Sequence, residues 1–388
     1  MYKISTDKRY EKFLNTPSFS ERYSSLLNSN KKNVIYIKEE FEPSTFRYRA
    51  YNVEETFRDS KKYYVSYFLT SEIPNLYELI DKLDIVIFQR SKWTIEIESF
   101  ITMLKYKGVK TAFDVDDAIY KTKYIKGYME SIGDNSKDNL KKKMDYAESL
   151  DKVASRVDFY ITTNDYLKKK LESDYNKKVY VFHNYINKEQ EEVAKKIVKD
   201  KSKLYDDSKF VIGYFSGSYS HNKDLKVVED TLVKLLKKYD DTYILIVGLM
   251  KLSDELNEFK EQGRVIFDPY VPYEELEYKI ASVDVNIIPL QMNDFNECKS
   301  ELKYFEASIV NTPTVACNNG TYGPIINNKI DGYLCNEDEW LDTLEYIYNN
   351  REESVKASSK ACSKCLDIYG YKNQLKLIEN IYDDILKK

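Results

Sequence analysis

The sequence predicts an α/β fold made of two doubly wound, Rossmann-like domains that face each other across a central cleft. Three observations carry this prediction. Short apolar runs of strand length alternate with amphipathic helical segments in both halves of the chain. A length of 388 residues is enough for two domains, each with its own core. Residues 185–208 contain almost no core-forming side chains, so they are interpreted as a partly helical connector.

The first half of the chain alternates strand and helix signals. Its apolar, β-rich runs predict strands at 33–38, 63–69, 84–90, 109–115, 157–163 and 178–184. A helix is expected at 49–62, and the polar, lysine-rich residues 121–150 are expected to form a loop followed by a helix. Such alternation is typical of a parallel sheet with helices on both faces. We therefore expect an N-terminal domain over residues 1–185.

A second alternating series follows the connector and predicts a C-terminal domain over residues 186–370. Strands are expected at 210–215, 242–248, 264–268, 284–288, 313–317 and 332–335. Helices are expected at 224–238, 273–282, 298–309, 321–328 and 337–350, and the tail from residue 352 to 388 is helical by pattern. Two parallel sheets in tandem bring the carboxyl ends of their strands to one cleft, which is where open α/β sheets bind ligands.

Composition narrows the class of function. A net charge of −4 and a pI near 5.7 argue against general nucleic-acid binding. No apolar run approaches the 18 or so residues of a membrane span, and the N-terminus lacks the apolar region of a signal peptide. Five cysteines, an odd number, fit a reducing compartment, so a cytoplasmic protein is expected. The lysine runs 141–143 and 168–170 leave peripheral contact with the inner face of a membrane open, although ordinary helix surface explains them better.

The residues that bind metals are scarce, whereas the glycines are concentrated in one half. Two histidines exclude a histidine-rich metal site, and the Cys362–Cys365 C-x-x-C pattern has no second Cys or His pair. No metal is therefore expected. Of 11 glycines, only Gly108, Gly127 and Gly133 precede residue 200. Because glycine lets the backbone approach a ligand closely, the ligand-binding loops are expected in the second half.

The stretch from Asn286 to Cys317 holds the strongest local signal. Two apolar runs flank an amphipathic helix, on which Lys299, Lys303 and Glu306 share one face near the N-terminal end. Two lysines one turn apart repel each other unless an anion lies between them. The helix N-terminus near Asn296–Ser300 also favours a phosphate. The alternative is an ordinary solvated helix face.

Charged residues in the first half are expected on the opposite side of the cleft. Asp114, Asp116 and Asp117 end a predicted strand, where three acids repel one another unless they are solvated, paired or bound to a cation. Pairing with Arg47 or Arg49, or contact with a ligand hydroxyl, is preferred to a metal site. Arg47 and Arg49 lie at the start of the first helix, where they could also contact an anion.

The second half of the chain resembles the donor-binding domain of glycosyltransferase family 4, which has the GT-B fold. Four segments carry the resemblance in order: FVIGYFSGSYSHNKDL, VIFDPYVPYEELEYKIASVDVNIIPL, KSELKYFEASIVNTPTVAC and GPIINNKIDGYLCNEDEWLDTLEYI. The first half is similar more weakly, through FRYRAYN and DVDDAIY. The resemblance implies that the last helix, 371–388, returns to the N-terminal domain. The stripe of Tyr371, Leu375, Ile378 and Tyr382 is suited to that packing.

The resemblance also implies roles for individual residues. In the first segment Gly217 falls on the family's glycine, Ser218 on its arginine and Lys223 on its lysine. Gly217 and Ser218 are then expected to hydrogen-bond a phosphate, Glu306 to hold the ribose, and Tyr270 and Val271 to meet the base. Lys223, Lys299 and Lys303 form the expected clamp on the leaving diphosphate, with Ser300 at the helix start and His221 nearby. Arg47 and Arg49 are expected to contact the donor phosphates or an acceptor anion, and the acidic cluster, including Asp117, to contact an acceptor hydroxyl.

This sequence departs from the family pattern at two positions. The family's first motif glutamate is replaced by Cys298, and its arginine by Ser218. The lysines at 299 and 303 are candidates to supply the missing positive charge. If a general base operates, Asp114 or Asp116 is the candidate. The resemblance instead implies retention of anomeric configuration, in which the departing phosphate takes the acceptor proton.

These inferences predict transfer of a sugar from a UDP-, GDP- or dTDP-sugar to a glycan, lipid-linked or protein acceptor, without a metal or other cofactor. Two alternatives remain. One is a catalytically weak GT-B subunit that binds a glycan or a partner transferase, suggested by the two departures. The other is a nucleotide-sugar epimerase, for which His183 and His221 are poor acid/base residues. The response of the melting temperature to different nucleoside diphosphates would separate them.

Overall fold

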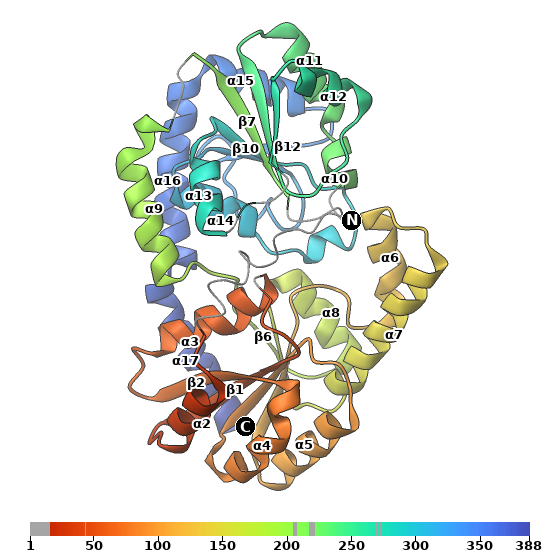
Figure 1. Cartoon of the computed structure of the whole chain (residues 1–388), viewed down its shortest axis with the longest axis vertical. Coiled ribbons are helices and arrows are strands. Elements are labelled where there is room, and N and C mark those ends of the chain that lie inside the picture. The colour runs from red at the N-terminus through yellow and green to blue at the C-terminus, as the bar shows by residue number, and fades with distance from the viewer. Residues whose placement is uncertain (1–15, 43, 205–207, 217–221, 269–270, 272) are drawn as a thin grey trace.

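The computed structural model describes all residues except 1–15, 43, 205–207, 217–221, 269–270 and 272. The chain forms two α/β domains, one above the other in Figure 1, and each is built on a six-stranded parallel sheet. Every strand expected from the sequence is present within a few residues of its expected bounds. The predicted fold class, two doubly wound domains facing a cleft, is therefore confirmed.

The N-terminal sheet has the strand order β2-β1-β3-β4-β5-β6. Its strands are mostly apolar and mostly buried on both faces, as parallel sheets covered by helices require. The strands are β1 (Lys32–Lys38), β2 (Tyr63–Leu69), β3 (Ile85–Gln89), β4 (Lys110–Asp114), β5 (Phe159–Thr162) and β6 (Val179–Val181). The α-helices are α2 (Phe19–Leu27), α3 (Asn52–Phe57), α4 (Ile73–Leu76), α5 (Ile95–Tyr106), α6 (Thr122–Ile132), α7 (Lys137–Ala154) and α8 (Asp165–Tyr175).

Shorter helical turns complete the N-terminal domain. A single π-helical turn, η1 (Arg47–Tyr51), leads into α3 and carries both arginines of the FRYRAYN segment. Two 3₁₀ segments, η2 (Thr70–Glu72) and η3 (Tyr77–Lys82), flank α4. The lysine-rich residues 121–150 form two helices, α6 and α7, rather than the expected loop and helix. Gly133 ends α6 in the left-handed conformation (φ 74°), which allows the sharp turn between them.

The C-terminal sheet has the order β12-β11-β10-β7-β8-β9, the Rossmann arrangement. Its strands are β7 (Phe210–Phe215), β8 (Thr242–Val247), β9 (Val265–Asp268), β10 (Val285–Ile288), β11 (Thr314–Cys317) and β12 (Tyr333–Cys335). The helices packed around it are α10 (Asn222–Lys226), α11 (Glu229–Lys238), α12 (Asp254–Glu261), α13 (Tyr273–Ala281), η6 (Asn296–Cys298), α14 (Leu302–Ile309), α15 (Trp340–Asn349) and α16 (Arg351–Tyr369).

The strand order fixes where a ligand can enter. In each sheet the direction of winding reverses once, between β1 and β3 in the first and between β7 and β10 in the second. Open α/β sheets leave a crevice at such switch points, at the carboxyl ends of the strands. Arg90 follows β3 and Leu290 follows β10, and both line the cavity between the domains.

Two crossings of the chain join the domains. Residues 182–187 lead from β6 into α9 (Lys188–Asp200), which continues as a 3₁₀ turn, η4 (Lys201–Lys203). The chain returns at Gly370, between α16 and α17 (Tyr371–Lys387), and the Ile186 amide donates to the Tyr369 carbonyl oxygen (2.9 Å). A Cβ at Gly370 would lie 2.2 Å from the Leu366 carbonyl oxygen, so only glycine fits this break without a shift.

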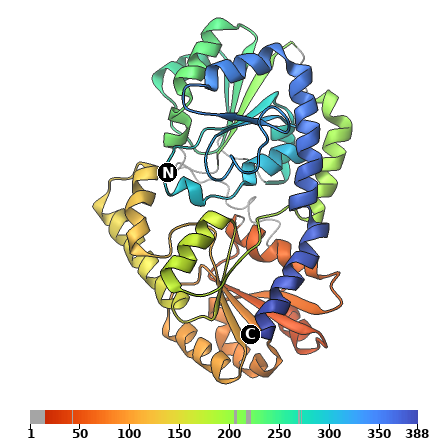
Figure 2. The same ribbon diagram turned by 180° about the vertical axis from the view of Figure 1, so that it is seen from behind.

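The last helix packs on the N-terminal domain. Figure 2 shows the blue C-terminal helices running from one domain to the other. Ile378, Tyr382 and Ile385 of α17 are completely buried. The Tyr382 hydroxyl is hydrogen-bonded to that of Tyr36 in β1 (2.8 Å), and Asp384 pairs with Lys178 (2.6 Å).

Two helices of the C-terminal half differ from the expectation. The helix expected at 321–328 is a series of turns, because Pro324 lacks an amide donor and the side chain of Asn319 accepts the amides of Thr321 and Tyr322. The helix expected at 224–238 is broken into α10 and α11.

Candidate active site

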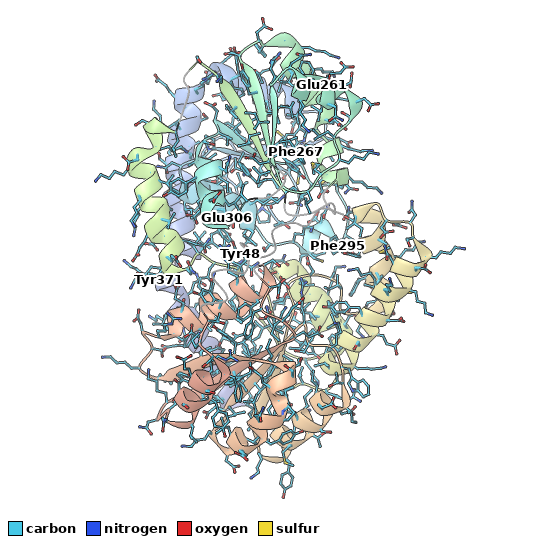
Figure 3. The ribbon with its side chains drawn as sticks, in the orientation of Figure 1. Tyr48, Glu261, Phe267, Phe295, Glu306 and Tyr371 are labelled. Carbon is cyan, nitrogen blue, oxygen red and sulfur yellow. The ribbon has the colours of Figure 1, made fainter. Side chains whose placement is uncertain are left out.

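A cavity of about 400 Å³ lies between the two domains at the carboxyl ends of both sheets. Figure 3 marks its neighbourhood with Tyr48, Phe295 and Glu306, which lie where the two domains meet. Residues from both domains line it: Ser44, Thr45, Tyr48, Arg90, Asp116, Asp117, Tyr128, Ser131, Ile132, Asn184, Asp224, Leu290, Phe295, Asn296, Lys299, Ser300, Leu302, Lys303 and Tyr322. Five of the residues singled out from the sequence are therefore brought together: Asp116, Asp117, Lys299, Ser300 and Lys303.

The C-terminal domain contributes the positive charge. Lys303 Nζ is buried, and within the described part of the chain it has no hydrogen-bond partner. Burial lowers the pKa of Lys303 to about 8; Asp224 and Glu306 oppose this shift, and Lys299 adds to it. The ammonium lies 5.2 Å from the ring centroid of Tyr214, on β7. A buried cation with spare donors is suited to an anionic ligand.

The helix that carries this cation begins later than the sequence predicted. The structure starts α14 at Leu302, whereas the expectation was residue 298. The carbonyl oxygens of Cys298 and Lys299 accept hydrogen bonds from Asn164 Nδ2 of the other domain (3.0 Å each), which replaces the helical hydrogen bonds expected there. Lys299 is extended (φ −72°, ψ 150°), so the two lysines reach the cavity from a loop and a helix rather than from successive turns.

The N-terminal domain contributes two carboxylates and one arginine. Arg90 binds Asp116 (2.5 Å) and Asp117 (2.7 Å). Its backbone is in the left-handed region (φ 44°), a conformation that costs energy for a non-glycine residue. One arginine shared by two carboxylates leaves this cluster of the N-terminal domain net negative, opposite the lysines of the other domain.

Asp114 does not line the cavity. It is completely buried and forms a two-point ion pair with Arg49, whose Nη2 and Nε lie 2.8 and 3.0 Å from its oxygens. Arg49 also donates to the Phe182 carbonyl oxygen (2.8 Å) and stacks on the Phe182 ring. The expected pairing of the acidic cluster with Arg49 is thus observed for Asp114. This enclosure removes both residues from direct contact with a ligand, so Asp114 is unsuited to act as a general base.

Glu306 is hydrogen-bonded to a residue of the N-terminal domain. Its carboxylate accepts a hydrogen bond from the hydroxyl of Tyr48, which in turn accepts one from Arg47 Nη2 (3.1 Å). Burial raises the pKa of Glu306, while Arg47, Tyr48 and Lys303 oppose the shift. Arg47 is itself buried and does not line the cavity.

The remaining predicted residues are more scattered. Lys223 is exposed; its Nζ donates to the Glu130 carbonyl oxygen of α6 (2.7 Å), at the rim of the cleft. Ser300 Oγ accepts from Asn184 Nδ2 of the opposite domain (3.0 Å). Val271 is half-buried in the turn after β9. Gly217, Ser218, His221 and Tyr270 lie outside the described residues.

The cavity residues that were not predicted from the sequence include Tyr48, Arg90, Asn184 and Asp224. Arg90 is the last residue of an expected strand, so the rule that ligands bind at strand carboxyl ends would have found it. Asp224 is buried and accepts from the Gln291 backbone amide (3.2 Å) and Nε2 (2.9 Å). Tyr48 and Asn184 carried no signal of their own, since their positions depend on contact between the domains.

Two further searches concern the described residues. They contain no group of three or more His, Cys, Asp or Glu side chains arranged to hold a metal ion. None of their helices combines the length and the apolarity needed to cross a membrane.

Comparison with known proteins shows a family for part of the C-terminal domain and the fold for the whole chain. Residues 209–350 match the family described as "Glycosyl transferases group 1". HepE from Anabaena, solved with UDP and glucose, superposes with a TM-score of 0.61 at 11% identity, covering 91% of this chain and 100% of HepE. The chain has the GT-B fold, with a segment in its C-terminal domain that matches group 1 glycosyl transferases.

Other solved structures share the fold of this chain. A glycosyltransferase from Rickettsia africae has a TM-score of 0.63 at 17% identity, with 93% of this chain and 100% of that one covered. TarM has a TM-score of 0.56 at 15% identity, with 80% of this chain and 57% of TarM covered. The comparison with curated proteins finds no match.

Proposed function

We propose that this protein is a glycosyltransferase, which moves a sugar from a nucleotide-sugar donor to a hydroxyl of a glycan, lipid-linked or protein acceptor, with retention and without a metal. The proposal rests on the cavity between the domains, where Lys299 and Lys303 meet the Arg90, Asp116 and Asp117 cluster of the other domain. The cationic half of the cavity is suited to a diphosphate. The acidic half is suited to a polyhydroxyl acceptor.

The observation that carries the proposal is the buried ammonium of Lys303. Charge develops on the diphosphate as the bond to the sugar breaks, and a preorganised cation stabilises that charge more in the transition state than in the ground state. Lys303 is fixed on α14 and buried before the ligand arrives, so it needs little reorganisation. Lys299 adds a second cation, and Lys223 joins this clamp if it leaves Glu130. Gly217, Ser218 and His221 belong to the proposed phosphate loop.

The other roles follow from the family resemblance and from the chemistry of the side chains. Glu306 accepts hydrogen bonds from the ribose hydroxyls, and the turn containing Tyr270 and Val271 meets the base. In a retaining reaction the departing phosphate oxygen takes the acceptor proton, and no protein base is required. Asp116 and Asp117 then orient the acceptor hydroxyl. If a protein base operates, Asp116 is the candidate, because it lines the cavity and Asp114 does not.

A UDP-sugar is the first donor to test, since HepE and TarM were both solved with UDP. The melting temperature is measured with UDP, GDP and dTDP, and sugar release from the matching nucleotide sugars is then followed with and without chelator. We expect one diphosphate to raise the melting temperature and chelator to leave turnover nearly intact. Turnover lost with chelator and restored by manganese would contradict the metal-free mechanism.

One alternative is favoured by a specific position. Cys298 replaces the family's first motif glutamate; it is completely buried, and its thiol donates to the Asp294 carbonyl oxygen (3.4 Å). A protein lacking that carboxylate suits a subunit that binds a glycan or a partner transferase with little turnover. Failure of every nucleoside diphosphate to raise the melting temperature would favour this alternative.

A further inference from the structure

One buried carboxylate lies in the cationic half of the cavity. Asp224 lines the cavity together with Lys299 and Lys303, and it is only 2% exposed. A carboxylate beside a site for a diphosphate repels the ligand, because both carry negative charge. Direct contact with the phosphates is therefore unsuited to Asp224, and its contacts with the protein indicate a different role.

Asp224 joins three segments of the cavity wall. It lies on α10, and its Oδ1 accepts from the backbone amide (3.2 Å) and Nε2 (2.9 Å) of Gln291, in the loop after β10. The same oxygen accepts from Nδ2 of Asn296, in η6 (3.4 Å). Because all three contacts come from N–H donors, they stabilise the ionised carboxylate. Asp224 is therefore a fixed negative charge that also holds the loop after β10.

Lys303 is the buried cation on which this charge acts. Its Nζ lies over the ring of Tyr214 and has no hydrogen-bond partner among the residues that the structure describes. Asp224 and Lys303 do not form an ion pair with each other, but charges act over several ångströms where water is excluded. Burial lowers the pKa of Lys303, and the charge of Asp224 is the largest influence that opposes this shift. Asp224 therefore favours the protonated form of Lys303.

The other charged or titratable groups around Lys303 do not depend on Asp224. In the C-terminal domain they are Lys299, Glu306, Cys317, Tyr214 and Tyr322. Across the cavity, the N-terminal domain presents Tyr48, Arg90, Asp116 and Asp117. Burial raises the pKa of Cys317 to about 12 and the pKa of Tyr214 well above its ordinary value, so neither titrates near neutral pH. A pH effect that appears only when Asp224 is changed therefore reports on Asp224.

We propose that Asp224 is a positioning residue of the donor site, which holds the loop after β10 and keeps Lys303 positively charged without contacting the donor. This inference rests on the proposed function, because it assumes that Lys303 receives the diphosphate. It adds that donor affinity depends on pH through a carboxylate that the ligand does not touch. Protonated Lys303 is the form that binds a diphosphate, so the measured affinity falls with the fraction of protein in that form.

The test measures the affinity for UDP, GDP and dTDP by calorimetric titration at pH 6.5 and at pH 8.5. It compares the wild type with Asp224→Asn and Asp224→Ser, which keep a hydrogen-bond acceptor for Gln291 and remove the charge. At pH 6.5 both variants should bind the preferred nucleotide at least as tightly as the wild type, because a repelling carboxylate is gone. At pH 8.5 they should bind it on the order of tenfold more weakly, because Lys303 has lost its proton in more of the protein.

The matched control is Asp294→Asn. The Asp294 carboxylate also accepts hydrogen bonds in the segment after β10, from Tyr166 and Lys170, but it does not line the cavity. The affinity of this variant relative to the wild type should be the same at both pH values. In a Lys303→Met background, Asp224→Asn should likewise change the affinity by the same factor at both pH values.

Three results would overturn the role of Asp224. They are a ratio of affinities between Asp224→Asn and the wild type that does not change with pH, a pH effect that persists in the Lys303→Met background, and failure of both Asp224 variants to fold, as judged by circular dichroism. The last result would make Asp224 a structural residue. If the wild type binds none of the nucleotides at either pH, the proposed function fails and this inference fails with it. A wild type that binds, with variants in a constant ratio to it, removes the role of Asp224 alone.

Discussion

Asp114 and Arg49 form a buried two-point ion pair in the N-terminal domain, and both side chains are fully enclosed. Neutralising one partner of a buried pair leaves the other charge uncompensated. Asp114→Asn should therefore lower the free energy of unfolding of this domain by about 3–5 kcal/mol, as measured by urea denaturation. Glu54→Gln, which breaks the exposed pair with Arg58, should cost under about 1 kcal/mol. An Asp114→Asn protein with wild-type stability and no turnover would restore Asp114 as a catalytic base.

Lys303 is expected to lower the stability of the protein and to raise its activity. Lys303→Met should lower kcat/KM by on the order of a hundredfold or more, as loss of one preorganised donor does. The same change should raise the melting temperature at pH 7, because the ammonium is buried without a partner within the described structure. Lys226→Met, at an exposed position of α10, should change neither. A destabilised Lys303→Met protein would contradict the assignment of an unsatisfied cation.

The pKa of Lys303 predicts how the effect of Lys303→Met on stability changes with pH. Its pKa is about 8 in the folded protein, below the ordinary value of 10.5. Below about pH 8 the Lys303 side chain is protonated in both the folded and the unfolded state, so the full cost of burying the ammonium is present. Between pH 8 and 10.5 the unfolded state binds more protons, so the stability of the wild type increases as pH rises. The difference in melting temperature between Lys303→Met and wild type should therefore shrink across this window.

Glu306→Gln tests the ribose contact. A hydrogen bond to a charged acceptor contributes about 1.5–3 kcal/mol, so the affinity for a nucleoside diphosphate should fall roughly tenfold or more. The measurement is calorimetric titration, with circular dichroism to verify that the variant is folded. An unchanged affinity in the folded variant would remove Glu306 from the donor site.

His183 and Glu301 form an ionic contact across the domain boundary, with Nδ1 and Oε1 2.6 Å apart. Burial lowers the pKa of His183, and the charge of Arg49 acts in the same direction. The hydrogen bond and charge of Glu301, together with the charge of Asp165, outweigh these effects, so the pKa of His183 is raised overall. The stabilisation is then fully present below about pH 6.5 and is lost as pH rises through the raised pKa.

His183→Asn should accordingly lower the melting temperature more at pH 6 than at pH 9. A loss of about 2–4 °C at pH 6 corresponds to roughly 1 kcal/mol in a domain of this size. The matched variant is Tyr369→Phe, which removes the other hydrogen bond to Glu301 (2.9 Å) without removing a titrating group. Its effect should be the same at both pH values. A His183→Asn loss that does not change with pH would contradict a charged imidazole in this contact.

The strands could be predicted from the sequence, but parts of the site could not. Runs such as Val285–Ile288 are apolar at every second residue or more, and parallel pairing buries them wherever they occur. The start of α14 was wrong by four residues, because Asn164 of the other domain takes the carbonyl groups that a helix would use. Local periodicity holds no information on such a contact.

The positions of the site side chains also depend on contacts that local periodicity does not show. Lys299 and Lys303 were found because their spacing marks one helix face, and they line the cavity even though only the second is on the helix. Asp114 and Asp116 looked equivalent in the sequence. The structure separates them, since β4 ends at Asp114 and directs it to Arg49, whereas Asp116 follows the strand and reaches Arg90.

The central claim is that the cavity between the domains holds the donor diphosphate against Lys303. A crystal structure of the protein with the nucleoside diphosphate that most raises its melting temperature tests this directly. We predict a phosphate oxygen within hydrogen-bonding distance of Lys303 Nζ, with Lys299 beside it. A nucleotide bound in the cavity with no phosphate contact to Lys303, or bound outside the cavity, would contradict the account.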